Sequence, residues 1–346
     1  MATISIRSPG LVHRFAITTA GEPYGGPLLE SMLKEEGQFH SSYYLLAGTY
    51  GTSRRAPAPL FFGQGFTDDI LGVDQVLVYS NLLFSLYPSA VVEMFFGDIG
   101  HQRANRKAAD MTAMRTRIQA FFAHYVKGTG PRPPLGVTAL TQTCPVSAPS
   151  GGPYTAATWT ALHPGVVRFS SQATRTILST GGDPAVAKAF DPVYGGLSCT
   201  TASAANEGAG VATYRLPPAT GSGYTLLGAP MVTADLKVTG EFAYIAARLV
   251  DVDPATNLKT LVSRSVYRID PNAPNGRQTF QTSANAYHFA AGHIPQLELL
   301  GRDAPFLRPS NGVFSIAVSN LELRLPVHEV PGARGTPSEV SRPTKE

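Results

Sequence analysis

The segment from residue 58 to residue 101 constrains the fold more than any other part of this 346-residue chain. It contains a short apolar run after two prolines (57–64), a stretch long enough for a helix (71–87) and a second apolar run (91–98). Strands of parallel sheets are buried on both faces, and they therefore read as nearly continuous apolar runs. The segment predicts a strand, a helix and a second strand parallel to the first.

Polar side chains with catalytic chemistry follow both predicted strands. Asp68 and Asp69 come just after the first strand, and His101 follows the second in a glycine-containing turn. In open parallel sheets, functional groups collect at the carboxyl ends of the strands. An acid followed along the chain by a histidine is the second half of the Ser–acid–His order of α/β-hydrolase triads. The pattern predicts part of a hydrolytic site.

The composition narrows the class of protein. The chain has 28 basic and 24 acidic residues, a formal charge of +4, and its basic residues are scattered. Such a balance predicts neither a nucleic-acid partner nor a membrane-surface protein. The sequence has no apolar run of about 18 residues, the length that a membrane span needs. Its first residues lack the basic and apolar regions of a signal peptide, so the sequence leaves the localisation open.

A change of character near residue 130 predicts a domain boundary. Apolar residues repeat every three or four positions over residues 105–130, which predicts an amphipathic helix. The prolines of residues 130–134 indicate a linker. Beyond them the segments are short, β-rich and separated by turns, which is typical of a sandwich or a jelly roll. The predicted strands are residues 137–143, 166–170, 211–216, 231–240, 241–252, 259–269, 296–300 and 313–327.

These segments give four predicted regions. Residues 1–57 would be the end of a helical cap or a connector, with a short helix over residues 27–37. Residues 58–130 would be the last part of an α/β domain with two parallel strands, residues 131–327 an all-β jelly-roll sandwich, and residues 328–346 a disordered tail.

The two cysteines, Cys144 and Cys199, fit no metal-binding spacing. They are a candidate disulfide closing a loop of more than fifty residues, which would suit an exported protein. The alternative is two separate buried thiols. A bridge there would stabilise the fold by roughly 4 kcal/mol on the loop-entropy model.

Several stretches, taken in order, resemble the X-Pro dipeptidyl-peptidase and CocE/NonD group of serine hydrolases. In the first half these are APLFFGQGFTDDILGVDQ (58–75), FGDIGHQRA (96–104) and FFAHYVKG (121–128), preceded by HSSYYLLA (40–47). In the second half they are ARLVDVDP (247–254), LVSRSVYRI (261–269), FAAGHIPQLELLGRDAPFLRPSNG (289–312) and LELRLPV (321–327). The resemblance implies a hydrolase domain with a helical cap, followed by a jelly roll.

The resemblance also implies roles for single residues. It places the catalytic acid at Asp68, rather than Asp69, and the general base at His101, while Asp98 is expected to cap a strand end. The implied reaction cleaves a peptide bond after an X-Pro dipeptide, or an ester or amide, through an acyl-serine. Its substrate would be a small peptide or ester, with no cofactor and no metal.

The nucleophile that this family requires is missing from the sequence. A serine on a Gly-x-Ser-x-Gly turn should lie well before the acid, and no such pattern occurs in the chain. We therefore expect a C-terminal portion of a hydrolase that is nearly inactive alone. Two buried strands without neighbours leave an apolar edge, so we expect the first 130 residues to be poorly stable or completed by a separate N-terminal hydrolase segment.

Two other functions remain open at this point. The β-rich half could be a carbohydrate-binding or interdomain module, with Tyr154, Trp159, Tyr194, Tyr224 and Phe306 as candidate platform residues. The chain could also be a non-functional gene fragment.

A group of charged residues in the β-rich half is expected to be structural. Arg248, Asp251, Asp253 and Arg264 lie on neighbouring predicted strands. They predict an ion-pair network, with a calcium site at Asp251 and Asp253 as the alternative.

Overall fold

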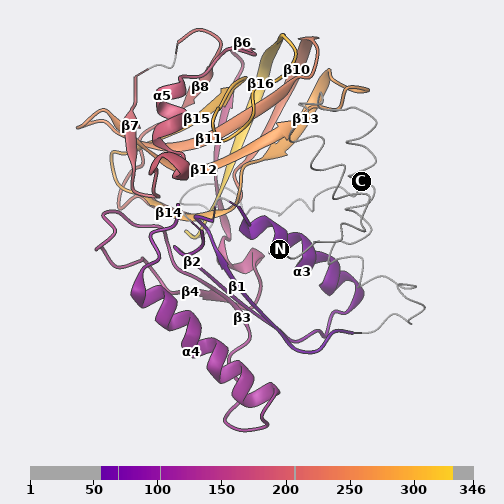
Figure 1. Cartoon of the computed structure of the whole chain (residues 1–346), viewed down its shortest axis with the longest axis vertical. Coiled ribbons are helices and arrows are strands. Elements are labelled where there is room, and N and C mark those ends of the chain that lie inside the picture. The colour runs from indigo at the N-terminus through magenta and orange to yellow at the C-terminus, as the bar shows by residue number, and fades with distance from the viewer. Residues whose placement is uncertain (1–55, 69, 102, 206–207, 330–346) are drawn as a thin grey trace, which may run out of the picture.

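The computed structural model of the chain describes residues 56–329, apart from residues 69, 102 and 206–207. Figure 1 shows a small α/β sheet with two long helices, next to which two larger antiparallel sheets are stacked. The predicted helix at residues 27–37 lies outside the described residues. The chain therefore has the two kinds of architecture that the sequence predicts, and most of its described residues lie in the β-rich part.

The first sheet contains three parallel strands and one antiparallel strand, in the order β1-β2-β3-β4. The strands are β1 (Leu60–Gly65), β2 (Val92–Gly97), β3 (Gly136–Ala139) and β4 (Tyr154–Ala156), and the helices are α3 (Val73–Leu86) and α4 (Ala108–Tyr125). All of β2 is buried, whereas β1 is mostly half-buried. Within the described ranges, no strand pairs with the outer edge of β1.

The two helices cover opposite faces of this sheet (Figure 1). Successive side chains of a strand point to opposite faces. Phe62 accordingly contacts Tyr79 of α3, with ring centroids 5.6 Å apart, while Phe61 contacts Phe121 of α4 at 5.8 Å. Burial on both faces explains why the first two strands read as apolar runs.

The β-rich part consists of two antiparallel sheets with a common hydrophobic core between them. The larger sheet runs in the order β13-β10-β16-β9-β14, and β5 and β6 also pair with β16. Its strands are β5 (Gly165–Ser171), β6 (Arg175–Leu178), β9 (Tyr224–Gly228), β10 (Met231–Gly240), β13 (Gly276–Gln281), β14 (Asn285–Phe289) and β16 (Phe314–Val327).

The smaller sheet runs in the order β7-β12-β11-β15-β8. Its strands are β7 (Thr201–Ser203), β8 (Ala212–Arg215), β11 (Tyr244–Asp253), β12 (Leu258–Arg268) and β15 (Ile294–Leu300). In the described part of the chain, three short helical segments lie outside the sheets: the 3-10 helices η3 (Thr160–Leu162) and η4 (Pro192–Tyr194), and α5 (Pro184–Ala189).

The strand alternation predicted for residues 231–240 is confirmed in β10. Val232, Ala234 and Leu236 are buried in the core, and the residues between them are more exposed. The pairing of β10 with β16 continues through the bulge between Thr233 and Asp235. An apolar inner face and a polar outer face fix this register, because a shift by one residue would exchange the two faces.

The predicted boundary at residue 130 needs a correction. The segment 137–143 is predicted as the first strand of the β-rich half, but β3 instead pairs in parallel with β2. β4 then adds antiparallel to β3. The small sheet thus includes residues on both sides of the prolines at 130–134, because the chain returns through that segment after α4. A strand of four residues is too short for its sequence to show which sheet it joins.

The start of the predicted disordered tail also differs. The His328 imidazole Nδ1 lies 2.9 Å from the Leu162 carbonyl oxygen, and the Glu329 carboxylate accepts hydrogen bonds from the Thr225 amide. These contacts extend the packed β-rich part by two residues.

Candidate active site

The register of β1 and β2 brings the predicted site residues to one edge of the sheet. Leu60 pairs with Val92 and Gly65 with Gly97, so the two strands end side by side. Asp68 lies three residues beyond the end of β1, and His101 lies four residues beyond the end of β2. Residues 33 positions apart in sequence thereby become neighbours.

Two glycines let the two loops touch. A Cβ atom on Gly65 would lie 1.5 Å from the Ile99 carbonyl oxygen. A Cβ atom on Gly100 would lie 2.7 Å from the Asp68 Cβ, and the Gly100 φ of 137° is one that glycine adopts without strain. Asp68 and His101 can therefore come together only because the residues at positions 65 and 100 have no side chain.

Asp68 and His101 form a hydrogen-bonded pair. His101 Nδ1 lies 2.9 Å from both Asp68 Oδ1 and Oδ2. The Asp68 side chain is only 4% exposed, whereas that of His101 is 46% exposed. The carboxylate is oriented by its own turn, since Oδ1 also accepts hydrogen bonds from the backbone amides of Ile70 and Leu71.

This geometry suits proton transfer by His101. A carboxylate at Nδ1 accepts a hydrogen bond from the Nδ1–H group and so favours the tautomer with its proton on Nδ1. The other ring nitrogen, Nε2, then keeps its lone pair. No residue in the described ranges hydrogen-bonds to Nε2. The arrangement is one in which a fixed imidazole offers an accessible base to a reacting group.

Asp98 has a different environment from Asp68. It is fully buried, and its carboxylate accepts hydrogen bonds from the Thr67 hydroxyl at 2.7 Å and the Ser198 hydroxyl at 3.4 Å. The backbone and side-chain amides of Asn105 also donate to it. Asp98 thus joins the loops after β1 and β2 to the β-rich part, a wider role than the strand-end cap expected from the sequence.

Two buried charged residues, Lys107 and Asp110, connect the start of α4 to the loop that follows β3. The Lys107 ammonium donates to the Thr143 and Ala148 carbonyls, and burial lowers its pKa from the usual value. The Asp110 carboxyl accepts from the Ser150 hydroxyl at 2.8 Å, and burial raises its pKa. These contacts hold α4 against the loop that follows β3.

A small cavity of about 150 Å³ lies beside Asp68. The β-rich part contributes Arg264 and Phe306 to its lining, and the Arg264 guanidinium lies 3.8 Å from the Phe306 ring centroid. The loop after β2 contributes Arg103. Arg264 and Phe306 were not connected with Asp68 from the sequence, because no local pattern indicates contact across more than 150 positions.

The charged residues of the smaller sheet form a buried network. Asp303, whose side chain is fully buried, pairs with both Arg248 and Arg264. Arg248 also pairs with Glu298, which in turn pairs with Lys259 at 2.7 Å. Burial alone would raise the pKa of Asp303, but the two guanidinium groups outweigh it and hold that pKa below its usual value.

The predicted network of four residues is thus found only in part. Arg248 and Arg264 are brought together, but through Asp303. Asp251 instead accepts a hydrogen bond from the Tyr287 hydroxyl and contacts His293, while Asp253 holds a turn at Thr256. Within the described part of the chain, no group of three or more His, Cys, Asp or Glu residues is arranged to hold a metal ion.

Cys144 and Cys199 are joined by a disulfide, with Cα atoms 5.4 Å apart. The bond connects the loop after β3 to the loop before β7. It lies close to Asp98, since Asn105 contacts both the Asp98 carboxylate and the Cys199 sulfur. The disulfide therefore fastens the loops that support the site to the β-rich part.

The five aromatic residues considered as a platform occupy separate environments. Tyr224 is buried in the core, Trp159 packs against Phe66 and Phe96, and Phe306 lies under Arg264. Tyr154 packs against His328, and Tyr194 alone of the five is exposed. They do not form a common surface.

Comparisons with known proteins identify the fold. A scan against protein-family models finds no match, and a search of curated proteins finds no match in sequence. An α-amino acid ester hydrolase shares the fold with a TM-score of 0.55 and 14% identity, covering 91% of this chain. A CocE/NonD family hydrolase from Staphylococcus aureus gives 0.53 and 10%, again over 91% of this chain. An aminopeptidase from a marine sediment Thaumarchaeota archaeon gives 0.54 and 13% over 77%.

These similarities confirm the predicted resemblance to CocE/NonD-type hydrolases at the level of fold. This chain spans 54% of the aminopeptidase and 62% of each of the other two structures. None of the helices in the described ranges has the length and apolar character of a membrane span.

Proposed function

We propose that Asp68 and His101 are the acid and the general base of a hydrolase that transfers an acyl group to water. The observation that carries this proposal is the pair of 2.9 Å contacts between His101 Nδ1 and the buried Asp68 carboxylate. The fold supports it, since hydrolases of the CocE/NonD type have the same architecture. The jelly-roll topology of the β-rich part belongs to this proposal as well.

His101 would act twice in each reaction cycle. Its Nε2 takes the proton of a serine hydroxyl as the serine oxygen attacks the carbonyl carbon, and then gives that proton to the leaving amine or alcohol. In the second half, Nε2 takes a proton from water, which attacks the acyl-serine, and returns it to the serine oxygen. Asp68 fixes the ring orientation and stabilises the imidazolium that forms in each half.

The serine would come from a polypeptide segment outside these 346 residues, because the sequence holds no Gly-x-Ser-x-Gly turn. β1 offers the surface for such a segment. Its outer edge is unpaired in the described part of the structure, and a strand added there would continue the parallel sheet. Its half-buried apolar side chains would be covered by the added strand.

The substrate class follows from the reaction. An acyl-serine forms from esters and from amides alike, and the similar structures include an ester hydrolase and an aminopeptidase. We infer a small ester or peptide substrate, with cleavage after an X-Pro dipeptide as the narrower prediction. Neither a cofactor nor a metal takes part in this mechanism.

A fluorophosphonate probe, which labels activated serines, tests the proposal. The 346-residue chain is labelled alone and after co-expression with a polypeptide that carries Gly-x-Ser-x-Gly, sought in the neighbouring reading frame. We expect no labelling of this chain alone and labelling of the second polypeptide in the complex. His101→Gln should abolish that labelling, whereas the matched change His124→Gln on α4 should leave it intact.

Two results would contradict the proposal. Strong labelling of the purified chain would place a nucleophile within it. Labelling of the complex that is unchanged by His101→Gln would remove His101 from the acid–base chemistry.

A further inference from the structure

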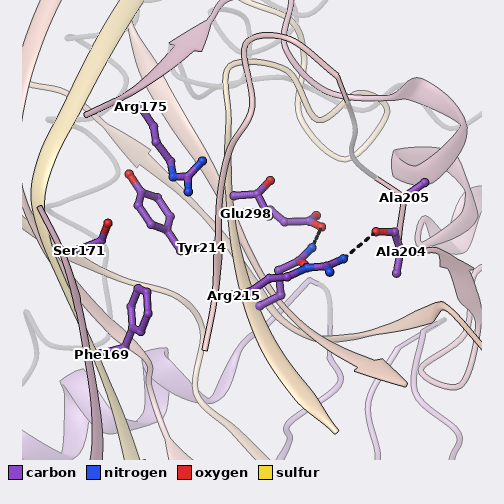
Figure 2. Close-up of a pocket in the computed structure, with 10 residues that line it drawn as sticks. Phe169, Ser171, Arg175, Ala204, Ala205, Tyr214, Arg215 and Glu298 are labelled. Carbon is purple, nitrogen blue, oxygen red and sulfur yellow. Dashed lines mark hydrogen bonds between the residues drawn. The ribbon is translucent and has the colours of Figure 1, made fainter. Parts of the chain in front are cut away.

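A second, larger cavity of about 460 Å³ lies at one side of the β-rich part, between its two sheets. Phe169, Ser171 and Arg175 line it from β5 and β6 of the larger sheet. Tyr214 and Arg215 line it from β8 of the smaller sheet (Figure 2). Asp68 and His101 do not line this cavity, so it is separate from the proposed hydrolytic site.

Two arginines bring positive charge to the cavity without a carboxylate partner. The Arg175 guanidinium lies 5.1 Å from the Tyr214 ring centroid, a cation–π contact. The Arg215 guanidinium donates from Nε to the Gln296 side-chain oxygen at 2.7 Å and from one terminal nitrogen to the Ala204 carbonyl. Within the described ranges, neither arginine forms an ion pair with a carboxylate.

The acidic residue that lines the cavity does not neutralise them. Glu298 is 1% exposed, and its carboxylate pairs with the buried Lys259 and Arg248. Its negative charge is therefore balanced inside the protein. Among the described residues that line the cavity, this leaves the positive charge of two guanidinium groups, which come from different sheets.

Tyr214 is a fixed support for Arg175. The side chain is 1% exposed, and burial raises its pKa to about 12, so the ring stays neutral at physiological pH. Figure 2 shows the ring between Phe169 and Arg175, with its hydroxyl end on the side of Arg175 and Ser171. A neutral aromatic face holds the guanidinium plane by cation–π attraction and leaves its N–H groups to bind oxygen atoms.

We propose that this cavity binds a small organic anion, a carboxylate- or phosphate-bearing molecule, through Arg175 and Arg215. Guanidinium groups bind both oxyanions through paired, charge-assisted hydrogen bonds. The concave shape strengthens the attraction, since a cleft lined by one sign of charge focuses its electrostatic potential. The Ser171 hydroxyl supplies a further polar group at the lining.

Calorimetric titration of the full chain at low ionic strength tests this site. Citrate serves as the carboxylate probe, glucose 6-phosphate as the phosphate probe and glucose as the neutral counterpart. We expect saturable binding of at least one anion, weakened by added salt, and no binding of glucose. The relative affinities for citrate and glucose 6-phosphate show whether the site prefers a carboxylate or a phosphate.

Substitutions then locate the binding. Arg175→Gln and Arg215→Gln should each weaken it by about tenfold, since a charge-assisted hydrogen bond contributes at least about 1.4 kcal/mol, one decade in Kd. Arg277→Gln is the matched control, because that arginine pairs with Asp235 on the outer face of the larger sheet. Thermal unfolding of each variant shows whether the fold is retained.

Three outcomes would overturn the proposal. These are the absence of saturable binding by either anion, equal binding of glucose, and anion affinity that is unchanged in the folded Arg175→Gln/Arg215→Gln double variant. Reduced anion affinity in both arginine variants, with unchanged affinity in Arg277→Gln, would support it.

Discussion

His163 is buried beside the small α/β sheet in its neutral form, and this makes stability depend on pH. Its side chain is 1% exposed, and neither ring nitrogen has a hydrogen-bond partner among the described residues. Burial lowers its pKa from 6.5 to about 4. This histidine therefore binds a proton at a higher pH in the unfolded chain than in the folded one. The free energy of unfolding falls as the pH drops from the unfolded pKa of 6.5 to the folded pKa of about 4.

The magnitude follows from the two pKa values. Each unit of difference between the folded and unfolded pKa values corresponds to about 1.4 kcal/mol. The free energy of unfolding therefore falls by about 3 kcal/mol in all once the pH is below both pKa values. Between about pH 7 and about pH 5 the loss is about 2 kcal/mol, because the unfolded histidine is then charged and the folded one is still neutral.

His163→Leu removes this titration. Between about pH 7 and about pH 5, the free energy of unfolding of this variant should fall by about 2 kcal/mol less than that of the wild type. At neutral pH it should be at least as stable, since a buried group without hydrogen bonds is replaced by an apolar one. His124→Gln, at a half-buried histidine on α4, should keep the wild-type pH dependence.

Tryptophan fluorescence during urea unfolding reports directly on this region. Trp159 is the only tryptophan of the sequence, and its ring centroid lies 5.8 Å from that of His163. The free energy of unfolding is measured at several pH values for the wild type and both variants. If the free energy of unfolding changed equally with pH in the wild type and in His163→Leu, the account of a buried neutral imidazole would be refuted.

Three further predictions concern the framework of the site. Asp303→Asn should lower the free energy of unfolding by about 4 kcal/mol, because it leaves two buried arginines without their shared carboxylate; a loss below about 1 kcal/mol in urea unfolding would contradict this. The double change Cys144→Ala/Cys199→Ala should cost up to about 4 kcal/mol on the loop-entropy model, and equal urea midpoints for this variant and the oxidised wild type would refute it. Gly100→Ala should displace the Asp68 loop and cost about 1 to 3 kcal/mol, from the strained φ and the close contact with Asp68; an Ala variant with wild-type stability would show that the two loops need no glycine there.

Long elements with a clear pattern were predictable from the sequence. β10 follows the predicted alternation from end to end, and the apolar runs gave β1 and β2. Short strands were missed, among them β4 and β7 with three residues each, because three residues are too few to show an alternating pattern. β9 is buried throughout, so it shows no alternation that would mark it as a strand.

Contacts within the site were predictable only between residues that follow consecutive strands of the chain. Asp68 and His101 follow neighbouring parallel strands, and this fixes their proximity. Arg264 and Phe306 lie far along the chain from Asp68, and no sequence pattern predicts that they line a cavity with it, since their positions depend on how the sheets pack. The same reason hid the cavity at Arg175 and Arg215, whose strands belong to different sheets.

The protonation of His101 tests the central claim most directly. Nitrogen-15 NMR of the histidine-labelled chain at neutral pH distinguishes a proton on Nδ1 from one on Nε2. Because Asp68 accepts at Nδ1, we expect the neutral ring to carry its proton there, with Nε2 free to act as a base. Asp68→Asn should remove this preference, whereas Asp270→Asn in an exposed turn should not. A wild-type ring with its proton on Nε2, or one unaffected by Asp68→Asn, would contradict the account.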